Sequence, residues 1–119
     1  MLNQTPARMV FGNGKISYSK QTNALNIFSI QDAILLDVRT IQEFARTKIP
    51  TAQHIALEDL ANQVDLVQTW NLPVIVYCTD GSKSRVATQL LKRAKVNAID
   101  GGAREELAKL LQKKKAIRH

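Results

Sequence analysis

Apolar and polar positions alternate along the chain in blocks that predict strands and helices in turn. Continuous apolar runs predict buried strands over residues 33–38, 73–78 and 96–100, and a short strand is expected over 53–55. Apolar residues at helical spacing predict helices over residues 57–70, 84–95 and 103–115. Thr40 is expected to cap a further helix over 41–46, with Glu43 completing a capping box. Alternating strands and helices indicate an α/β domain with a mostly parallel central sheet and helices on both faces.

The first part of the chain gives weaker signals. Residues 1–24 are predicted to form an N-terminal extension, with a turn at Asn13-Gly14 and an edge strand over 16–18. A short helical turn is expected over 24–30. Residues 25–119 are predicted to form the domain itself, which ends in a basic helix and tail.

Cys78 is the last residue of the apolar run over 73–78, and the chain then turns into a predicted helix. A short loop before a helix N-terminus directs backbone N–H groups inward and forms an anion-binding nest. Such a nest would stabilise a thiolate at Cys78. Gly81 suits a position of positive φ, and Ser84 could cap the helix or hydrogen-bond to a sulfur or oxyanion. The alternative is a buried cysteine that packs as a small apolar residue.

Charged residues around Cys78 act in opposite directions. Lys83 and Arg85 would add positive charge near the sulfur, whereas Asp80 would subtract it. A carboxylate beside a nucleophile disfavours a doubly negative substrate. Asp80 is therefore expected to disfavour a doubly negative reactant at Cys78.

The segment from Cys78 to Ser84 resembles the active-site loop of the rhodanese family of sulfurtransferases, in which a cysteine ends a strand and a glycine follows three residues later. The resemblance covers about residues 30–112. It extends to Asp37-Val38-Arg39 with Glu43-Phe44, to Ile49, Ala52 and Ile55, and to Ile99-Asp100-Gly101-Gly102.

This resemblance implies a three-layer domain and a double-displacement reaction. A Cys78 thiolate would take sulfur from a small donor, thiosulfate or a persulfide such as glutathione persulfide, and pass it to a thiol or cyanide. The acceptor could be an acidic protein. Neither a metal nor a cofactor is implied, and His54 and His119 receive no catalytic role. The resemblance assigns anion binding to the backbone of the loop, formed by Thr79, Asp80, Gly81, Ser82, Lys83 and Ser84.

Two other functions remain open. A phosphatase or arsenate reductase needs an arginine six positions after the cysteine, so that its guanidinium can bind the oxyanion in a bidentate manner. That position is Ser84, and Arg85 comes one residue too late. A non-catalytic module that binds a partner protein is the second alternative. Arg39 is expected to form a structural ion pair with Asp37 or Glu43.

Composition and charge limit the classes of partner that the protein is expected to bind. Residues 1–82 hold six Lys/Arg and seven Asp/Glu, whereas residues 83–119 hold eleven Lys/Arg and three Asp/Glu. A solvated basic helix or a surface for an acidic partner explains this excess. Nucleic-acid binding is disfavoured, since no aromatic residues interleave with these charges. The single cysteine, and the absence of a secretory signal or a long apolar segment, favour a cytoplasmic protein away from membranes.

Overall fold

The computed structural model describes residues 32–117, and the side chains up to residue 115. The predicted turn at Asn13-Gly14, the edge strand over 16–18 and the helical turn over 24–30 lie outside the described residues.

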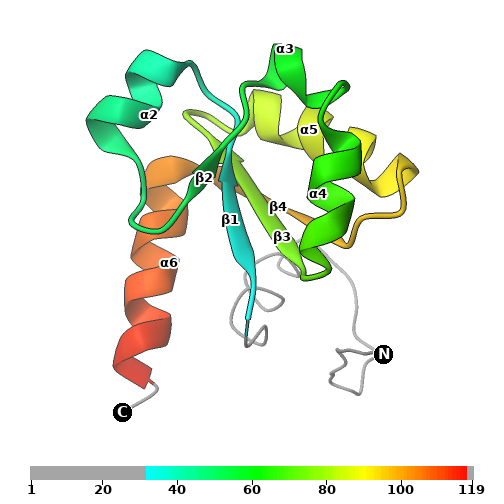
Figure 1. Ribbon diagram of the computed structural model, residues 1–119. Coiled ribbons are helices and arrows are strands. Elements are labelled where there is room, and N and C mark those ends of the chain that lie inside the picture. The colour runs from blue at the N-terminus through cyan, green and yellow to red at the C-terminus, as the bar shows by residue number, and fades with distance from the viewer. Residues whose placement is uncertain (1–31, 118–119) are drawn as a thin grey trace.

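Four strands form one parallel sheet in the order β2-β1-β3-β4 (Figure 1). The predicted α/β class with a parallel sheet is thus confirmed. All strands point the same way, so their carboxyl ends share one edge of the sheet, at the top of Figure 1. The elements in chain order are β1 (Ile34–Asp37), α2 (Ile41–Thr47), β2 (Gln53–His54), α3 (Leu57–Leu60), α4 (Val64–Trp70), β3 (Val74–Cys78), α5 (Ser82–Arg93), β4 (Ala98–Ala103) and α6 (Arg104–Ile117).

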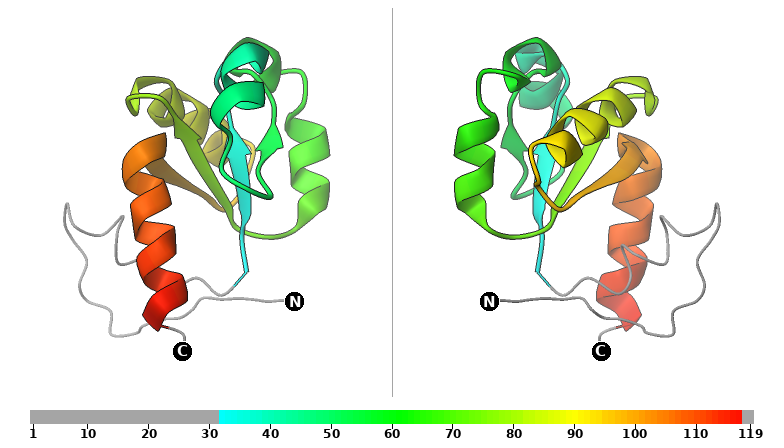
Figure 2. Two further views of the ribbon diagram at one scale, coloured as in Figure 1. Left: turned by 90° about the vertical axis from the view of Figure 1, so that its left-hand side faces the viewer. Right: turned by 90° about the vertical axis from the view of Figure 1, so that its right-hand side faces the viewer.

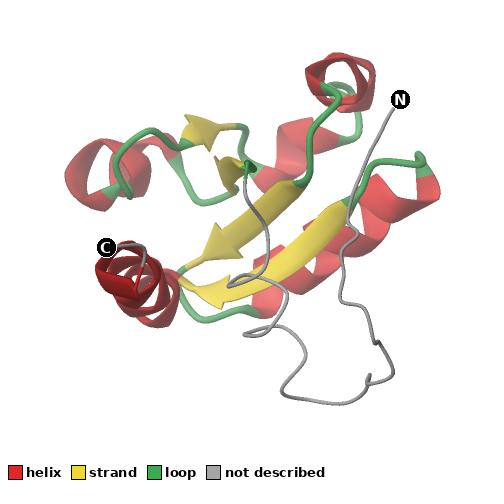
Figure 3. Ribbon diagram, turned by 90° about the horizontal axis from the view of Figure 1, so that it is seen from below, coloured by secondary structure: helices red, strands yellow, loops and turns green. Residues whose placement is uncertain are grey.

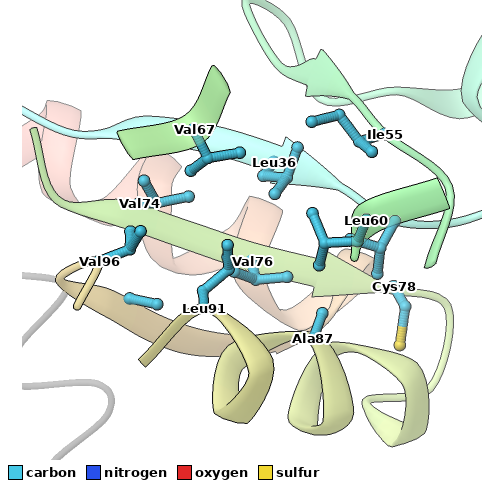
Figure 4. Packing of buried hydrophobic residues seen from close by; sticks show 12 residues of the cluster. Leu36, Ile55, Leu60, Val67, Val74, Val76, Cys78, Ala87, Leu91 and Val96 are labelled. Atoms are coloured by element: carbon cyan, nitrogen blue, oxygen red, sulfur yellow. The ribbon is translucent and has the colours of Figure 1, made fainter. Parts of the chain in front are cut away.

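Helices cover both faces of the sheet, as Figures 2 and 3 show. On one face, α3, α4 and α5 pack on the sheet through a cluster that includes Leu36, Leu60, Val76 and Leu91 (Figure 4). On the other face, α6 packs through Leu107 against Ile75 and Tyr77. Every residue of β3 is buried because this strand lies between two neighbours and two layers of helices. This burial explains why residues 73–78 read as an unbroken apolar run.

The prediction of one continuous helix over residues 57–70 is wrong. The structure divides it into α3 and α4, which are separated by a turn at 61–63 where Gln63 has φ −118° and ψ 7°. The backbone N–H groups of Asn62 and Gln63 donate to Asp59 and Leu60, three residues back. Both halves still direct apolar side chains to the core, so the periodicity alone does not reveal the break.

Gly101 and Gly102 follow the strand predicted over residues 96–100, but in the structure they lie inside β4, which forms a bulge. Val76 pairs with Asp100 and Tyr77 pairs with Gly102, so Gly101 is the additional residue. A Cβ atom on Gly101 would lie 2.8 Å from Ile75 Cγ2 and 3.0 Å from Leu107 Cδ2. Glycine is therefore required where α6 approaches the sheet.

Asp37, Arg39 and Tyr77 form a buried polar group at the carboxyl edge of β1 and β3. The Arg39 side chain donates to both carboxylate oxygens of Asp37, with Nη2–Oδ2 at 2.8 Å and Nε at 3.1 Å from each oxygen. This ion pair confirms one of the two partners predicted for Arg39. The Tyr77 hydroxyl accepts a hydrogen bond from the Ile49 backbone at 3.0 Å.

Because of Tyr77, the protein is expected to lose stability at alkaline pH. Burial raises the pKa of Tyr77 to about 12. Between the ordinary tyrosine pKa near ~10 and this value, the unfolded phenol ionises while the folded one stays neutral. The stabilisation is complete below about pH 10 and falls as pH rises through 12, by roughly 2–3 kcal/mol. Urea denaturation from pH 9 to 12 measures it, and Tyr77→Phe should remove this component of the loss.

Candidate active site

The Cys78 sulfur lies at the carboxyl end of β3, against the first turn of α5 (Figure 4). Two backbone N–H groups donate to Sγ: that of Gly81 at 3.0 Å and that of Ser84 at 3.3 Å. The loop therefore directs N–H groups onto the sulfur, and a thiolate accepts such hydrogen bonds more strongly than a thiol does. Cys78 is buried, with 1% of its surface exposed.

The loop is short because α5 begins early. Gly81 is the N-cap residue with φ 92°, a conformation that favours glycine, and the helix starts at Ser82. Asp80 stabilises this start: its Oδ1 accepts from the Ser82 backbone N at 2.9 Å and from the Ser82 hydroxyl at 2.7 Å. The predicted helix start at Ser84 was therefore two residues late, and Ser84 does not act as the N-cap.

Asp80 also lies beside the nucleophile candidate. Its Oδ1 is 3.9 Å from Cys78 Sγ and is placed to accept a hydrogen bond from the thiol. The backbone hydrogen bond from Ser82, reinforced by the Ser82 hydroxyl, lowers the pKa of Asp80. At neutral pH the sulfur therefore has two N–H donors on one side and a carboxylate on another.

The remaining predicted loop residues have different surroundings. Thr79, Ser82 and Lys83 are exposed. The Thr79 hydroxyl donates to Glu43 Oε2 at 3.4 Å, which connects the loop to α2. Ser84 is buried, and its hydroxyl donates to Asp100 Oδ1 at 2.7 Å. The sequence interpretation did not give Glu43 or Asp100 a place in the loop.

Glu43 has the capping role that the sequence predicts. Its backbone N donates to the Thr40 hydroxyl at 3.2 Å, and its carboxylate accepts from the Thr40 backbone N at 3.1 Å. The latter hydrogen bond lowers the pKa of Glu43. The charged carboxylate thus remains available to Thr79 at neutral pH.

Outside the loop, His54 contacts a backbone oxygen and an aromatic ring. His54 Nε2 is 2.8 Å from the backbone oxygen of Arg39, and its ring lies against Phe44 with centroids 4.8 Å apart.

In the part of the chain that the structure describes, no three His, Cys, Asp or Glu side chains are grouped as metal ligands. Among residues 32–117, no helix is long and apolar enough to cross a membrane.

Comparison with known proteins identifies the family that this fold and loop define. The family model of the rhodanese-like domain matches residues 20–116. The chain therefore belongs to the rhodanese-like domain family, as its cysteine loop and its Asp37-Val38-Arg39 segment suggested.

Individual relatives agree with this assignment. The chain is 33% identical over 73 residues to a tRNA sulfurtransferase of Desulfurococcus amylolyticus, covering 60% of this chain but only 14% of that protein. Among solved structures, SSP1007 of Staphylococcus saprophyticus subsp. saprophyticus is similar with a TM-score of 0.58 and 26% identity, covering 73% of this chain and 87% of that one. The human single-domain sulfurtransferase TSTD1 has a TM-score of 0.50 and 25% identity, covering 63% and 80%.

Proposed function

We propose that this protein is a sulfurtransferase that carries sulfane sulfur as a persulfide on Cys78. The observation that supports it best is the pair of backbone N–H groups of Gly81 and Ser84 directed at Sγ. A cysteine that only packed in the core would not require donors from the first turn of a helix. The sulfurtransferase names of the human and Desulfurococcus amylolyticus relatives agree with this proposal.

The reaction proceeds in two displacements. The Cys78 thiolate attacks the outer sulfur of a donor, a sulfur–sulfur bond forms at Sγ, and the bond within the donor breaks. Thiosulfate leaves as sulfite, and a persulfide leaves as its parent thiolate. An acceptor thiolate or cyanide then attacks the terminal sulfur and releases Cys78 as a thiolate. Both steps leave negative charge on sulfur, which the loop N–H groups stabilise.

Intact mass spectrometry tests the proposal directly. The purified protein is incubated with glutathione persulfide or thiosulfate and then with cyanide. A gain of one sulfur, about 32 Da, that maps to Cys78 and is discharged by cyanide is the expected result. If neither donor loads Cys78 while iodoacetamide alkylates it, the sulfur is accessible but sulfur transfer is excluded. If iodoacetamide fails as well, Cys78 is an inert core residue.

Asp80 makes a persulfide the better donor. A negative oxygen 3.9 Å from Sγ repels the two charges of thiosulfate more strongly than the single charge of an ionised persulfide group. Asp80→Asn should therefore raise kcat/KM for thiosulfate by roughly tenfold and change that for glutathione persulfide by less than about threefold. Steady-state assays with both donors measure the ratio. Asp65→Asn, the same change of charge on exposed α4, is the matched control, and an equal gain there would contradict the role of Asp80.

The acceptor and the cellular location also belong to the proposal. The excess of Lys and Arg in residues 83–119 supports an acidic protein thiol as the acceptor. Transfer to such an acceptor should slow as salt rises, and salt-insensitive transfer would count against it. Persulfide chemistry on a lone cysteine suits a reducing compartment such as the cytoplasm.

Two observations weaken the alternatives. A phosphatase of this spacing needs an arginine at position 84, but Ser84 is buried and its hydroxyl is bonded to Asp100. Arg85 is exposed. A partner-binding module without catalysis would have no use for the N–H groups directed at Sγ.

A further inference from the structure

Asp100 connects the active-site helix to the bulge of the neighbouring strand. Its Oδ1 accepts a hydrogen bond from the Ser84 hydroxyl at 2.7 Å and another from the Gly102 backbone N at 2.9 Å. One carboxylate oxygen therefore holds the third residue of α5 and the residue after the bulge at a fixed separation. The hydroxyl of Ser84 also lies 3.1 Å from the Gly81 backbone oxygen.

The second N–H donor, Gly81, lies near the same part of β4. The position that a Cβ atom would occupy on Gly81 lies 3.7 Å from the Gly102 Cα and 3.9 Å from the Ala103 N. The strand register explains why Gly81 lies near these residues, since Cys78 pairs with Ala103. Both residues whose N–H groups reach Sγ thus lie near residues 100–103, and Ser84 is hydrogen-bonded to this segment through Asp100.

We propose that Asp100 is a positioning residue for sulfur transfer: it holds Ser84 so that the Ser84 N–H stays directed at Cys78 Sγ. This inference rests on the proposed function. Asp100 does not contact the sulfur, and it acts through Ser84 and through the bulge. A single side-chain oxygen that accepts both hydrogen bonds suits a support that must fix an N–H donor within a few tenths of an ångström.

The experiment compares Asp100→Ala, which removes the acceptor, with Asp100→Asn, whose amide oxygen can accept the same two hydrogen bonds. Asp100→Ala should lower kcat with glutathione persulfide by roughly tenfold, with KM changed by less than about twofold. It should also slow alkylation of Cys78 by iodoacetamide. Asp100→Asn should restore both rates to within about threefold of wild type. Ser84→Ala should also lower kcat, and the double variant should be no slower than Asp100→Ala, since Asp100→Ala already removes the hydrogen bond between the two side chains.

Gln68→Ala is the matched control for stability. The Gln68 side chain donates to the Ala94 backbone oxygen at 2.7 Å, so this variant also loses a link from a side chain to another helix. It should lose a similar amount of stability while keeping kcat. Equal kcat in Asp100→Ala and wild type, or failure of Asp100→Asn to restore an impaired rate, would overturn the inference. Absence of sulfur loading in wild type would instead overturn the proposed function, and the alkylation rates would still test the support of Ser84.

Discussion

Cys78→Ser should abolish sulfur transfer and leave the fold intact. A serine hydroxyl at the end of β3 can accept the N–H groups of Gly81 and Ser84, so no buried donor loses its partner. Because the hydroxyl does not ionise at neutral pH, it cannot attack the donor sulfur. The rate should fall by more than about 1,000-fold, and the mass gain should disappear.

Two measurements accompany this variant. The free energy of unfolding in urea should stay within about 1 kcal/mol of wild type, which separates loss of the nucleophile from loss of the fold. Cys78→Ala leaves the two N–H groups without an acceptor and should be both inactive and less stable. Transfer by Cys78→Ser at the wild-type rate would contradict the nucleophile assignment and with it the proposed function.

Local patterns were sufficient for most of the fold. The apolar run before Cys78 predicted β3 because a strand covered on both faces needs apolar residues at every position. The capping box of Thr40 and Glu43 was also predictable, since all its atoms lie within four residues. The break between α3 and α4 was not, because a turn that preserves the apolar spacing leaves no mark on the pattern.

Only those parts of the site that are formed by residues close together in the sequence were predictable. The sequence placed Cys78 at a strand end beside Gly81 and Asp80, and the structure brings these together as a loop. The sequence pattern predicted a helix start at Ser84, because it does not reveal the hydrogen bonds from Ser82 to Asp80 that stabilise an earlier start after Gly81. The contact of Ser84 with Asp100 depends on the register of β3 and β4, including the extra residue at Gly101. No spacing between neighbours in the sequence encodes that register.

Arg39→Met should cause the largest loss of stability among the changes considered. Asp37 is fully buried, and the Arg39 guanidinium supplies its only opposite charge in the described ion pairs. Methionine would fill much of the volume but leave a buried carboxylate with no cation. Removal of one partner of a buried pair typically costs about 3–5 kcal/mol. That is a large share of the about 5–15 kcal/mol by which a domain is stable. Urea denaturation followed by circular dichroism measures the loss.

The double variant Asp37→Asn with Arg39→Met separates the loss of stability caused by an unpaired buried charge from the loss caused by poorer packing. It removes both charges, so it should recover part of the loss seen with Arg39→Met alone. Arg39→Lys keeps a charge but not the planar fork that binds both oxygens of Asp37, and its loss should be intermediate, which provides a measurable variant if Arg39→Met does not fold. Arg46→Met, at an exposed position of α2, should change stability by less than about 0.5 kcal/mol. A similarly small change in Arg39→Met would contradict the stabilising role of the buried Asp37–Arg39 pair at the carboxyl end of β1.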